Sequence, residues 1–164
     1  MKTMNYYYKS MPSVIGQLKL VATDSGLAAI LWENDDPRRV RLGPLIENRT
    51  HSILLEAERQ LREYLEGKRR IFNLQLDPAG TAFQTRVWEA LKAIPFGETR
   101  SYSDIARQTG NAKASRAVGA ASGKNPLSVV IPCHRVIGVS GNLTGFAGGL
   151  RVKAHLLALE SDDG

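Results

Sequence analysis

The chain contains a single cysteine, Cys133, among 164 residues. One cysteine cannot form an internal disulfide, which excludes the small secreted scaffolds that depend on such bonds. It also excludes a cysteine-rich zinc site, because a structural zinc takes four protein ligands and only three scattered histidines accompany the cysteine. The chain must therefore fold around an apolar core, and with 43% hydrophobic residues it is long enough for one domain or two small lobes. Cys133 is either an inert buried thiol or the centre of the chemistry.

No segment of the sequence predicts export or membrane insertion. Residues 1–5 are not followed by the apolar run of a secretory signal. No stretch approaches the roughly 20 apolar residues that a membrane helix needs. We therefore expect no membrane partner and a cytoplasmic location, or a nuclear one if the source is a eukaryote.

Positive charge is concentrated in the second half of the chain. The formal net charge is +6, from 22 Lys and Arg against 16 Asp and Glu. Residues 86–153 contain ten basic residues and three acidic ones, whereas the rest of the chain is close to neutral. This local excess predicts a surface that binds a polyanion.

The first eighty residues have the pattern of a small α+β lobe. Alternation at 18–23 and an apolar run at 27–32, joined by Asp24-Ser25-Gly26, predict a β-hairpin in an antiparallel sheet. Helical spacing over 52–65, with Gly67 as the stop, predicts a helix.

The best domain boundary follows this lobe. Residues 71–76 predict a short strand, and residues 77–80 read Asp-Pro-Ala-Gly, a typical break. We expect an N-terminal α+β domain at 1–78 and a C-terminal domain at 79–164.

The second half predicts a mostly helical domain. Thr81 is a suitable N-cap for a helix that ends before Pro95. Residues 103–108 and 112–121 then predict two helices around a Gly-containing turn, which is a helix-turn-helix pattern. DNA-binding proteins use this geometry, and so do enzymes that never meet DNA.

The chemistry is expected near Cys133. The continuous apolar run 127–131 predicts a buried strand that breaks at Pro132, and Cys133-His134-Arg135 follows directly. Nearby positive charge lowers the pKa of a thiol toward the reactive thiolate. Neighbouring residues of an extended segment point to opposite faces, so Cys133 and His134 cooperate only across a backbone turn or through a water.

The last predicted helix, 151–160, contains the acid expected to orient the imidazole. Its apolar positions Val152, Leu156, Leu157 and Leu159 are expected to be buried. Glu160 near its end is the only acid between Cys133 and the terminal Asp162-Asp163.

These motifs resemble the O6-alkylguanine-DNA alkyltransferase family. The resemblance covers about residues 81–160. It is carried by Phe83-Gln84-Thr85-Arg86-Val87-Trp88, Ile94-Pro95-Phe96-Gly97-Glu98, Ser101-Tyr102, Arg116-Ala117-Val118-Gly119, Asn125-Pro126, Pro132-Cys133-His134-Arg135-Val136, Gly148-Gly149-Leu150 and Lys153.

The resemblance implies direct repair of DNA. Cys133 would take the alkyl group from O6 of guanine, and from O4 of thymine, as a stable thioether, so that each chain acts once. His134 would act through water as the base on Cys133, Glu160 would orient His134, and Asn125 would fix the turn before the site. The resemblance implies no cofactor, no metal and no obligate protein partner.

The implied partner is double-stranded DNA that contains O6-alkylguanine. The damaged nucleotide would be flipped out of the duplex from the minor groove, with Arg116 filling the vacated stack and Tyr102 crowding the flanking phosphate while donating to the guanine. The residues implied on the DNA side are Ser101, Tyr102, Arg116, Ala117 and Gly119. Those implied in the guanine pocket are Ser122, Val136, Phe146, Ala147 and Lys153.

The sequence departs from the family pattern at the pocket. Phe146 stands where the family usually has Tyr, which removes a hydroxyl, and Ser122 stands where a larger residue is common. These differences bear on the preference among alkyl groups. The competing interpretations are a non-catalytic binder of alkylated DNA, a cysteine hydrolase or protease, and a helix-turn-helix regulator with an inert thiol.

Overall fold

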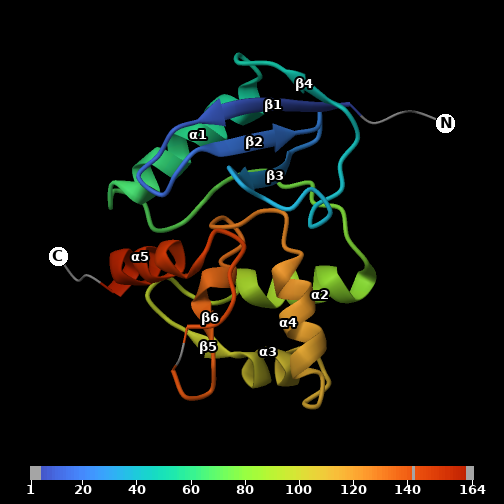
Figure 1. Ribbon diagram of the computed structural model, residues 1–164, viewed down its shortest axis with the longest axis vertical. Coiled ribbons are helices and arrows are strands. Elements are labelled where there is room, and N and C mark those ends of the chain that lie inside the picture. The colour runs from blue at the N-terminus through green and yellow to red at the C-terminus, as the bar shows by residue number, and fades with distance from the viewer. Residues whose placement is uncertain (1–4, 142, 162–164) are drawn as a thin grey trace. The chain divides into compact units, whose positions relative to one another are not determined.

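The computed structural model describes residues 5–141 and 143–161, and the chain forms two compact units, Met1–Ala79 and Gly80–Gly164 (Figure 1). The first unit is a sheet with one long helix, and the second is mostly helical. The expected α+β class is confirmed. Within the described ranges, no helix combines the length and the apolar character needed to cross a membrane.

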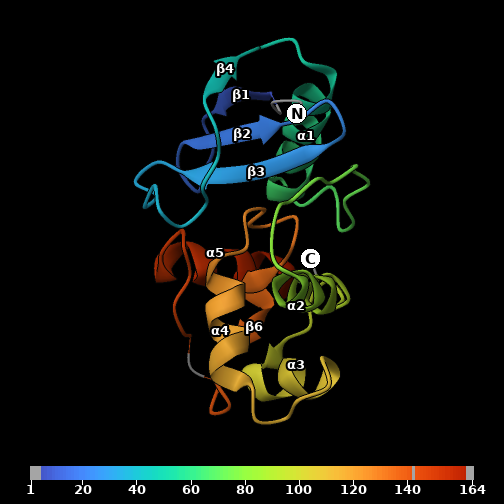
Figure 2. The same cartoon turned by 90° about the vertical axis from the view of Figure 1, so that its right-hand side faces the viewer.

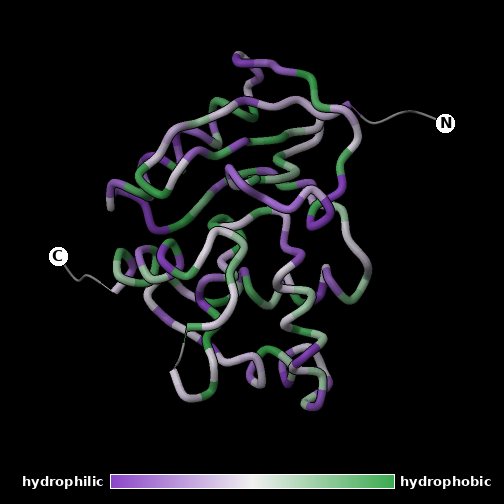
Figure 3. Tube along the Cα trace, viewed as in Figure 1, coloured by the Kyte–Doolittle hydropathy of each residue, from purple (hydrophilic) through white to green (hydrophobic). Residues whose placement is uncertain are grey.

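A four-stranded sheet is the core of the first unit. Its strands are β1 (Tyr6–Met11), β2 (Leu18–Ala22), β3 (Leu27–Trp32) and β4 (Leu45–Glu47), in the order β3-β2-β1-β4. The β1–β2 and β2–β3 pairs are antiparallel and β1–β4 is parallel, so the sheet is mostly antiparallel. The predicted hairpin is β2–β3, and most of its residues are buried. Figure 3 shows the hydropathy of each residue along this trace.

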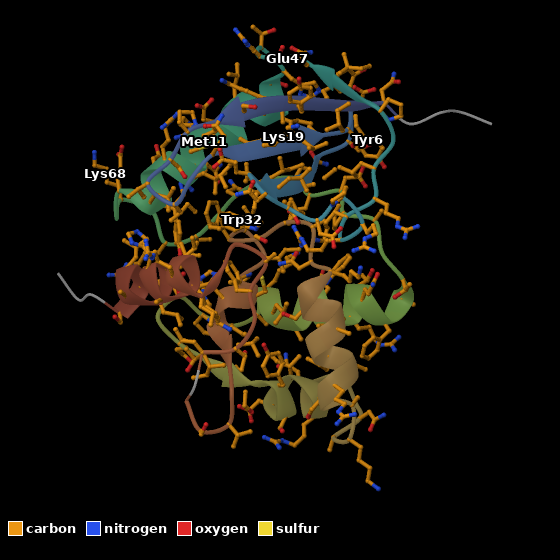
Figure 4. All side chains as sticks on the ribbon, viewed as in Figure 1. Tyr6, Met11, Lys19, Trp32, Glu47 and Lys68 are labelled. Atoms are coloured by element: carbon orange, nitrogen blue, oxygen red, sulfur yellow. The ribbon has the colours of Figure 1, made fainter. Side chains whose placement is uncertain are left out.

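Helix α1 (Ser52–Leu65) packs on one face of this sheet (Figure 2). Leu54 and Leu61 recur at helical spacing and are fully buried beneath it. The helix ends before Gly67, whose φ of +77° is the left-handed conformation that closes a helix. Lys68 then points into solvent at the helix exit (Figure 4).

The sheet differs from the sequence prediction in two segments, the inner strand β1, which was not predicted, and residues 71–76. Strand β1 begins with three tyrosines, residues 6–8, all of them half-buried, and therefore shows no alternation. The prediction of a strand over 71–76 is wrong. That segment makes a single bridge to the sheet: the Leu27 N–H donates to the Gln75 carbonyl at 2.8 Å and the Asp77 N–H donates to the Leu27 carbonyl at 2.7 Å.

The α-helices that the structure describes in the second unit are α2 (Ala82–Lys92), α3 (Tyr102–Gln108), α4 (Ser115–Gly123) and α5 (Leu150–Ser161). Thr81 caps α2 in a reciprocal capping box with Gln84, as its position predicts. The indole N–H of Trp88 donates to the Ala121 carbonyl at 2.9 Å and ties α2 to α4. Helices α3 and α4 occupy the predicted helix-turn-helix positions, although α4 begins three residues later than expected, at Ser115.

The apolar run 127–131 is a turn, so the predicted strand is wrong. The Ile131 N–H donates to the Leu127 carbonyl at 2.8 Å, which closes a five-residue turn. Val129 within it has a φ of +77°, an uncommon conformation for a β-branched residue, and is 1% exposed. An apolar run signals burial, but its periodicity does not separate a strand from other buried backbone.

Two very short strands place the segment around Cys133 beside the start of α3. Strands β5 (Arg100–Ser101) and β6 (Val136–Ile137) pair in parallel. Strand β5 leads directly into α3, and β6 directly follows the segment that contains Cys133. The pair therefore positions the start of α3 next to the candidate site.

Candidate active site

Cys133 lies in a short 3-10 turn, Cys133–Arg135, directly after Pro132. The Cys133 N–H donates to the Ile131 carbonyl at 2.8 Å, and the Arg135 N–H donates to the Pro132 carbonyl at 2.9 Å. The cysteine is 7% exposed. The expectation that it ends an extended strand is wrong, and the opposite-face restriction on Cys133 and His134 therefore does not apply.

The ring of His134 is held by Glu160 from α5. Its Nε2 lies 2.8 Å from Oε2 of Glu160, and both side chains are buried. A carboxylate only accepts hydrogen bonds, so we infer that Nε2 carries the ring hydrogen and that Nδ1 presents a lone pair. Nδ1 is buried without a hydrogen-bond partner among the described residues, and water normally satisfies such an atom. The histidine is thus oriented at one nitrogen and basic at the other.

Glu160 is also clamped by Arg135. The guanidinium donates from Nε to Oε1 at 2.8 Å and from Nη2 to Oε2 at 3.0 Å, a two-point contact that fixes the plane of the carboxylate. Its Nη1 donates to the Ile94 carbonyl at 2.6 Å, and the guanidinium carbon lies 5.8 Å from the centre of the Phe96 ring. The sequence suggested Arg135 as a charge that activates the thiol, but its guanidinium is instead engaged by Glu160.

Burial keeps His134 neutral. Removal from water lowers the pKa of His134 below its usual 6.5, against the opposing effect of Glu160, and the charges of Arg135 and Lys153 lower it further. A neutral imidazole at neutral pH is the form that accepts a proton.

Lys153 is a buried cation on the other side of the turn. Its Nζ donates to the Val136 carbonyl at 2.6 Å and to the Thr144 carbonyl at 3.2 Å, and the residue is fully buried. Burial lowers the pKa of Lys153, and the charge of Cys133 opposes this by favouring the ammonium form. The same attraction favours a thiolate at Cys133.

Asn125 holds the two ends of the turn that precedes the site. Its Nδ2 donates to the Ile131 carbonyl at 2.9 Å, and its Oδ1 accepts from the Leu127 N–H at 2.9 Å. The residue is fully buried, so the Leu127 N–H depends on it, while the Ile131 carbonyl also accepts from the Cys133 N–H.

The remaining pocket candidates differ in exposure. Phe146 is half-buried and meets the His134 ring edge-on, with centroids 6.5 Å apart and planes at 86°. Ala147 is exposed and Ser122 is buried, at 8% exposure, on α4.

The candidates on α3 and α4 also differ in their contacts and exposure. Ser101 is the N-cap of α3 in a capping box with Asp104. Tyr102 bonds to Thr144, and Gly119 on α4 lies beside the Tyr102 ring. Arg116 and Ala117 are exposed on α4, separate from the buried group around Cys133.

The sequence analysis did not select Thr144, which links Lys153 to Tyr102. It selected Arg135 but not its pairing with Glu160, which lies 25 residues away in the sequence. Helix α5 also differs from its prediction, because of its expected core only Leu156 is buried while Lys153 and Glu160 are buried beside it. Among the described residues, no group of His, Cys, Asp and Glu could hold a metal ion.

Comparison with known proteins gives matches over both units. Residues 6–78 match the ribonuclease-like domain of 6-O-methylguanine DNA methyltransferase, and residues 82–162 match its DNA binding domain. The methylated-DNA–protein-cysteine methyltransferase of Methanosarcina acetivorans is 45% identical over 154 residues, covering 94% of this chain and 97% of its own. That of Mycobacterium leprae is 47% identical over 152 residues, covering 93% and 90%.

Solved structures agree with these matches. The crystal structure of Mycobacterium tuberculosis OGT in complex with DNA superposes with a TM-score of 0.87 at 42% identity, covering 94% of this chain and 92% of that one. With two domain matches, close relatives along nearly the whole chain and a buried Cys-His-Glu group, the chain belongs to the 6-O-methylguanine DNA methyltransferase family, the methylated-DNA–protein-cysteine methyltransferases.

Proposed function

We propose that this chain repairs DNA by transferring the alkyl group of O6-alkylguanine, and of O4-alkylthymine, to Sγ of Cys133. Family membership supports alkyl transfer to a protein cysteine, and a relative with 42% identity has been crystallised with DNA. The observation that carries the proposal is the buried histidine beside the cysteine, which is held by Glu160 at Nε2 and whose Nδ1 has no hydrogen-bond partner in the part of the chain that the structure describes.

The transfer uses the side chains as follows. Nδ1 of His134 takes the Cys133 proton through a water, and the Lys153 ammonium favours the resulting thiolate. The thiolate attacks the alkyl carbon, so the S–C bond forms as the C–O6 bond breaks. The guanine leaves with the electron pair and takes up a proton. Arg135 holds the Glu160 carboxylate in place while His134 becomes charged.

The product limits each chain to one reaction. A thioether is not readily hydrolysed, and the transfer itself regenerates no thiol. The proposal therefore needs neither a cofactor nor a metal, and no obligate protein partner.

The proposed DNA surface is the exposed side of α4. Arg116 would enter the duplex from the minor groove and fill the stack left by the flipped nucleotide, at a cost of a few kcal/mol for unstacking. Ala117 and Gly119 would allow a close approach of the helix, with Ser101 and Tyr102 at the start of α3 beside it. The excess of basic residues over 86–153 supports contact with the phosphates.

The proposed pocket lies between the Cys133 turn and the loop before α5. The carbonyls of Cys133 and Val136 and the amide of Ala147 would bind the guanine edge, with Phe146 and Ser122 on its walls. Lys153 would act on the pocket through the Val136 carbonyl that it holds at 2.6 Å.

The proposal assigns both reaction and DNA binding to a domain at 79–164, preceded by a domain at 1–78. It also places the protein where its substrate is, in the cytoplasm of a prokaryote or the nucleus of a eukaryote.

Intact-mass spectrometry tests the reaction. After incubation with a duplex that contains O6-methylguanine, we expect a gain of one methyl group per chain, mapped to Cys133 and absent in Cys133→Ser. Binding without any mass gain would favour a non-catalytic damage binder. Repeated product formation by one chain would favour a hydrolase, and either result would overturn the proposal.

A second variant tests the role of α4. Arg116→Ala should slow transfer from duplex DNA more than transfer from free O6-benzylguanine, because the free base needs no flipping. Arg86→Ala is the matched control, since it removes the same charge from an exposed position on α2. Equal losses on the two substrates, or equal losses in the two variants, would contradict a stack-filling role for Arg116.

A further inference from the structure

The turn that follows α2 has no part in the transfer chemistry described above. It consists of Ile94-Pro95-Phe96-Gly97, and we call it the α2 turn. The Glu98 N–H donates to the Pro95 carbonyl at 3.1 Å, and Gly97 has a φ of +84°. Glycine is favoured at such a position in a turn of four residues. Because the turn is closed by the Glu98 N–H, the Gly97 N–H is available to another acceptor.

The α2 turn contacts the buried Arg135–Glu160 pair. The Ile94 carbonyl accepts from Nη1 of Arg135 at 2.6 Å, and the centre of the Phe96 ring lies 5.8 Å from the guanidinium carbon, within reach of a cation–π interaction. The Gly97 N–H donates to Oε1 of Glu160 at 3.4 Å, a long hydrogen bond. A Cβ on Gly97 would stand 3.3 Å from the Glu160 carbonyl oxygen, so this approach leaves little room for a side chain.

These contacts act on His134 through Glu160. The Glu160 carboxylate lies against His134 at Oε2 and accepts from the α2 turn at Oε1, and Arg135 donates to both oxygens. A carboxylate engaged at both oxygens cannot rotate without losing charge-assisted hydrogen bonds. The Phe96 ring lies over a guanidinium that is 9% exposed, so it helps to keep water away from the pair.

We propose that Phe96 and Gly97 are positioning residues that hold Glu160, and through it His134, in the orientation needed to take the proton of Cys133. The inference rests on the proposed function, because it takes His134 as the base of the transfer. If the α2 turn served only to end α2, changes in it would lower the stability of the second unit and leave the protonation of His134 as it is.

Loss of this support should make His134 easier to protonate. Burial is the largest cause that lowers the pKa of His134, the charges of Arg135 and Lys153 lower it further, and Glu160 raises it. These groups and the Cys133 thiol belong to α5 and to the histidine's own turn, and the charged residues of α2 are exposed. Water that enters beside the pair, or a guanidinium that moves away, would therefore raise the pKa of His134 toward its usual 6.5.

The pH dependence of alkyl transfer tests the two residues. The rate of benzyl transfer from free O6-benzylguanine is measured by intact-mass spectrometry at pH 7.5 and at pH 6, so that DNA binding plays no part. In Phe96→Leu and Gly97→Ala, the rate at pH 6 should fall below that at pH 7.5 by up to about fourfold, the limit for a histidine with its ordinary pKa. The wild-type protein should lose less, and Phe96→Tyr, which keeps the ring, should behave as the wild type.

Two variants of the same unit are matched controls. Phe83→Leu removes a ring whose centre lies 5.7 Å from the guanidinium carbon of Arg86, an exposed residue of α2. Gly110→Ala places a side chain at a φ of +96°, where a Cβ meets no atom within 4 Å in the described part of the chain. Both should keep the wild-type ratio of the two rates. Wild-type ratios in Phe96→Leu and Gly97→Ala, or the same decline in the controls, would overturn the inference. A decline in only one of the two variants would overturn it for the other residue.

A spectroscopic titration separates this inference from the proposed function. In nitrogen NMR spectra of the isotopically labelled protein, the imidazole signals of His134 are assigned by their absence from His134→Gln, and they report protonation without any transfer. Absence of alkyl transfer by the wild-type protein would remove the proposed function alone. His134 should then still take up its proton at a higher pH in Phe96→Leu and Gly97→Ala than in the wild type. Identical titrations in all three proteins would overturn the positioning role.

Discussion

In the described part of the first unit, the buried polar side chains are those of Thr23 and Gln60, and neither is charged. Charged groups of this unit stay at the surface, as in the pair formed by Arg59 and Glu63 at 2.8 Å. The second unit buries a larger polar set around its cysteine, consisting of Ser122, Asn125, Ser128, His134, Arg135, Lys153 and Glu160.

The interior of the first unit therefore provides stability, whereas the buried polar groups of the second unit provide the chemistry. A buried ion pair gains little net stability, because each charge loses its hydration on folding. The Arg135–Glu160 pair is therefore poorly explained as a device for stability. Its geometry is well explained by the need to hold one carboxylate against His134.

The largest expected effect comes from breaking that pair. Glu160→Ala leaves the Arg135 guanidinium buried and unpaired, so we expect it to lower the unfolding free energy of the second unit by about 3–5 kcal/mol. The matched control is Glu58→Ala, which breaks partly exposed pairs with Lys9 and Arg62 in the first unit and should cost about 1 kcal/mol or less.

Urea denaturation measures each unit separately, because each contains one of the two tryptophans, Trp32 and Trp88. Trp32→Phe leaves Trp88 as the probe of the second unit, and Trp88→Phe does the converse. Similar losses for Glu160→Ala and Glu58→Ala would show that the buried pair is no more than an ordinary surface pair.

Two buried amides allow a closer comparison. Asn125 satisfies the Leu127 N–H and the Ile131 carbonyl, and Gln60 satisfies both the N–H and the carbonyl of Asn73. Gln60→Ala leaves both backbone groups of Asn73 without this partner and should cost about 2 kcal/mol or more in the first unit. Asn125→Ala removes the partner of the Leu127 N–H, while the Ile131 carbonyl still accepts from the Cys133 N–H at 2.8 Å, so we expect a cost of about 1–3 kcal/mol in the second unit.

The two variants should differ in activity. Asn125→Ala should also lose methyl transfer, because the turn before Cys133 is released, while Gln60→Ala should keep it. Mass spectrometry at a temperature where both variants remain folded measures this. Loss of transfer in Gln60→Ala would show that the first unit contributes to the reaction.

Acid should weaken the two units in different pH ranges. Because burial lowers the pKa of His134, the unfolded chain takes up a proton below pH 6.5 that the folded unit does not. The second unit should therefore lose stability as the pH falls from 6.5 toward the folded pKa, by at most about 1.4 kcal/mol per pH unit.

The first unit should respond at lower pH. A hydrogen bond from Arg59 lowers the pKa of Glu56 from 4.5 to about 2, so its contribution is lost only as the pH falls through that range. Denaturation from pH 7.5 to pH 5, followed by each tryptophan, tests this difference. A parallel decline of both probes above pH 5, or an unchanged slope in His134→Gln, would contradict the assignment to His134.

The sequence predicted the elements that rest on local signals. The β2–β3 hairpin follows from alternation around a Gly-containing turn, and α2 follows from Thr81 and its apolar stripe. The prediction over 127–131 failed because a side chain outside the run decides its conformation: Asn125 bonds both ends and bends it into a turn.

The candidate site shows the same limit. Cys133, His134 and Glu160 could be selected from residue type and position, and the structure places the last two 2.8 Å apart. The prediction for α5 was based on its apolar positions, with charged residues facing solvent. It therefore did not include the burial of Lys153 and Glu160. Their partners, Thr144 and Arg135, are set by tertiary packing, which no local spacing reveals.

Val129 shows how the turn before the cysteine restricts substitution. A left-handed backbone there costs about 1–3 kcal/mol, which glycine would relieve, but glycine would also give up the roughly 1.5–3 kcal/mol of a buried valine side chain. Asparagine accepts the backbone angle and would bury an amide in an apolar site. No single residue suits both the backbone and the packing, so libraries selected for higher stability should return valine at this position while its neighbours vary.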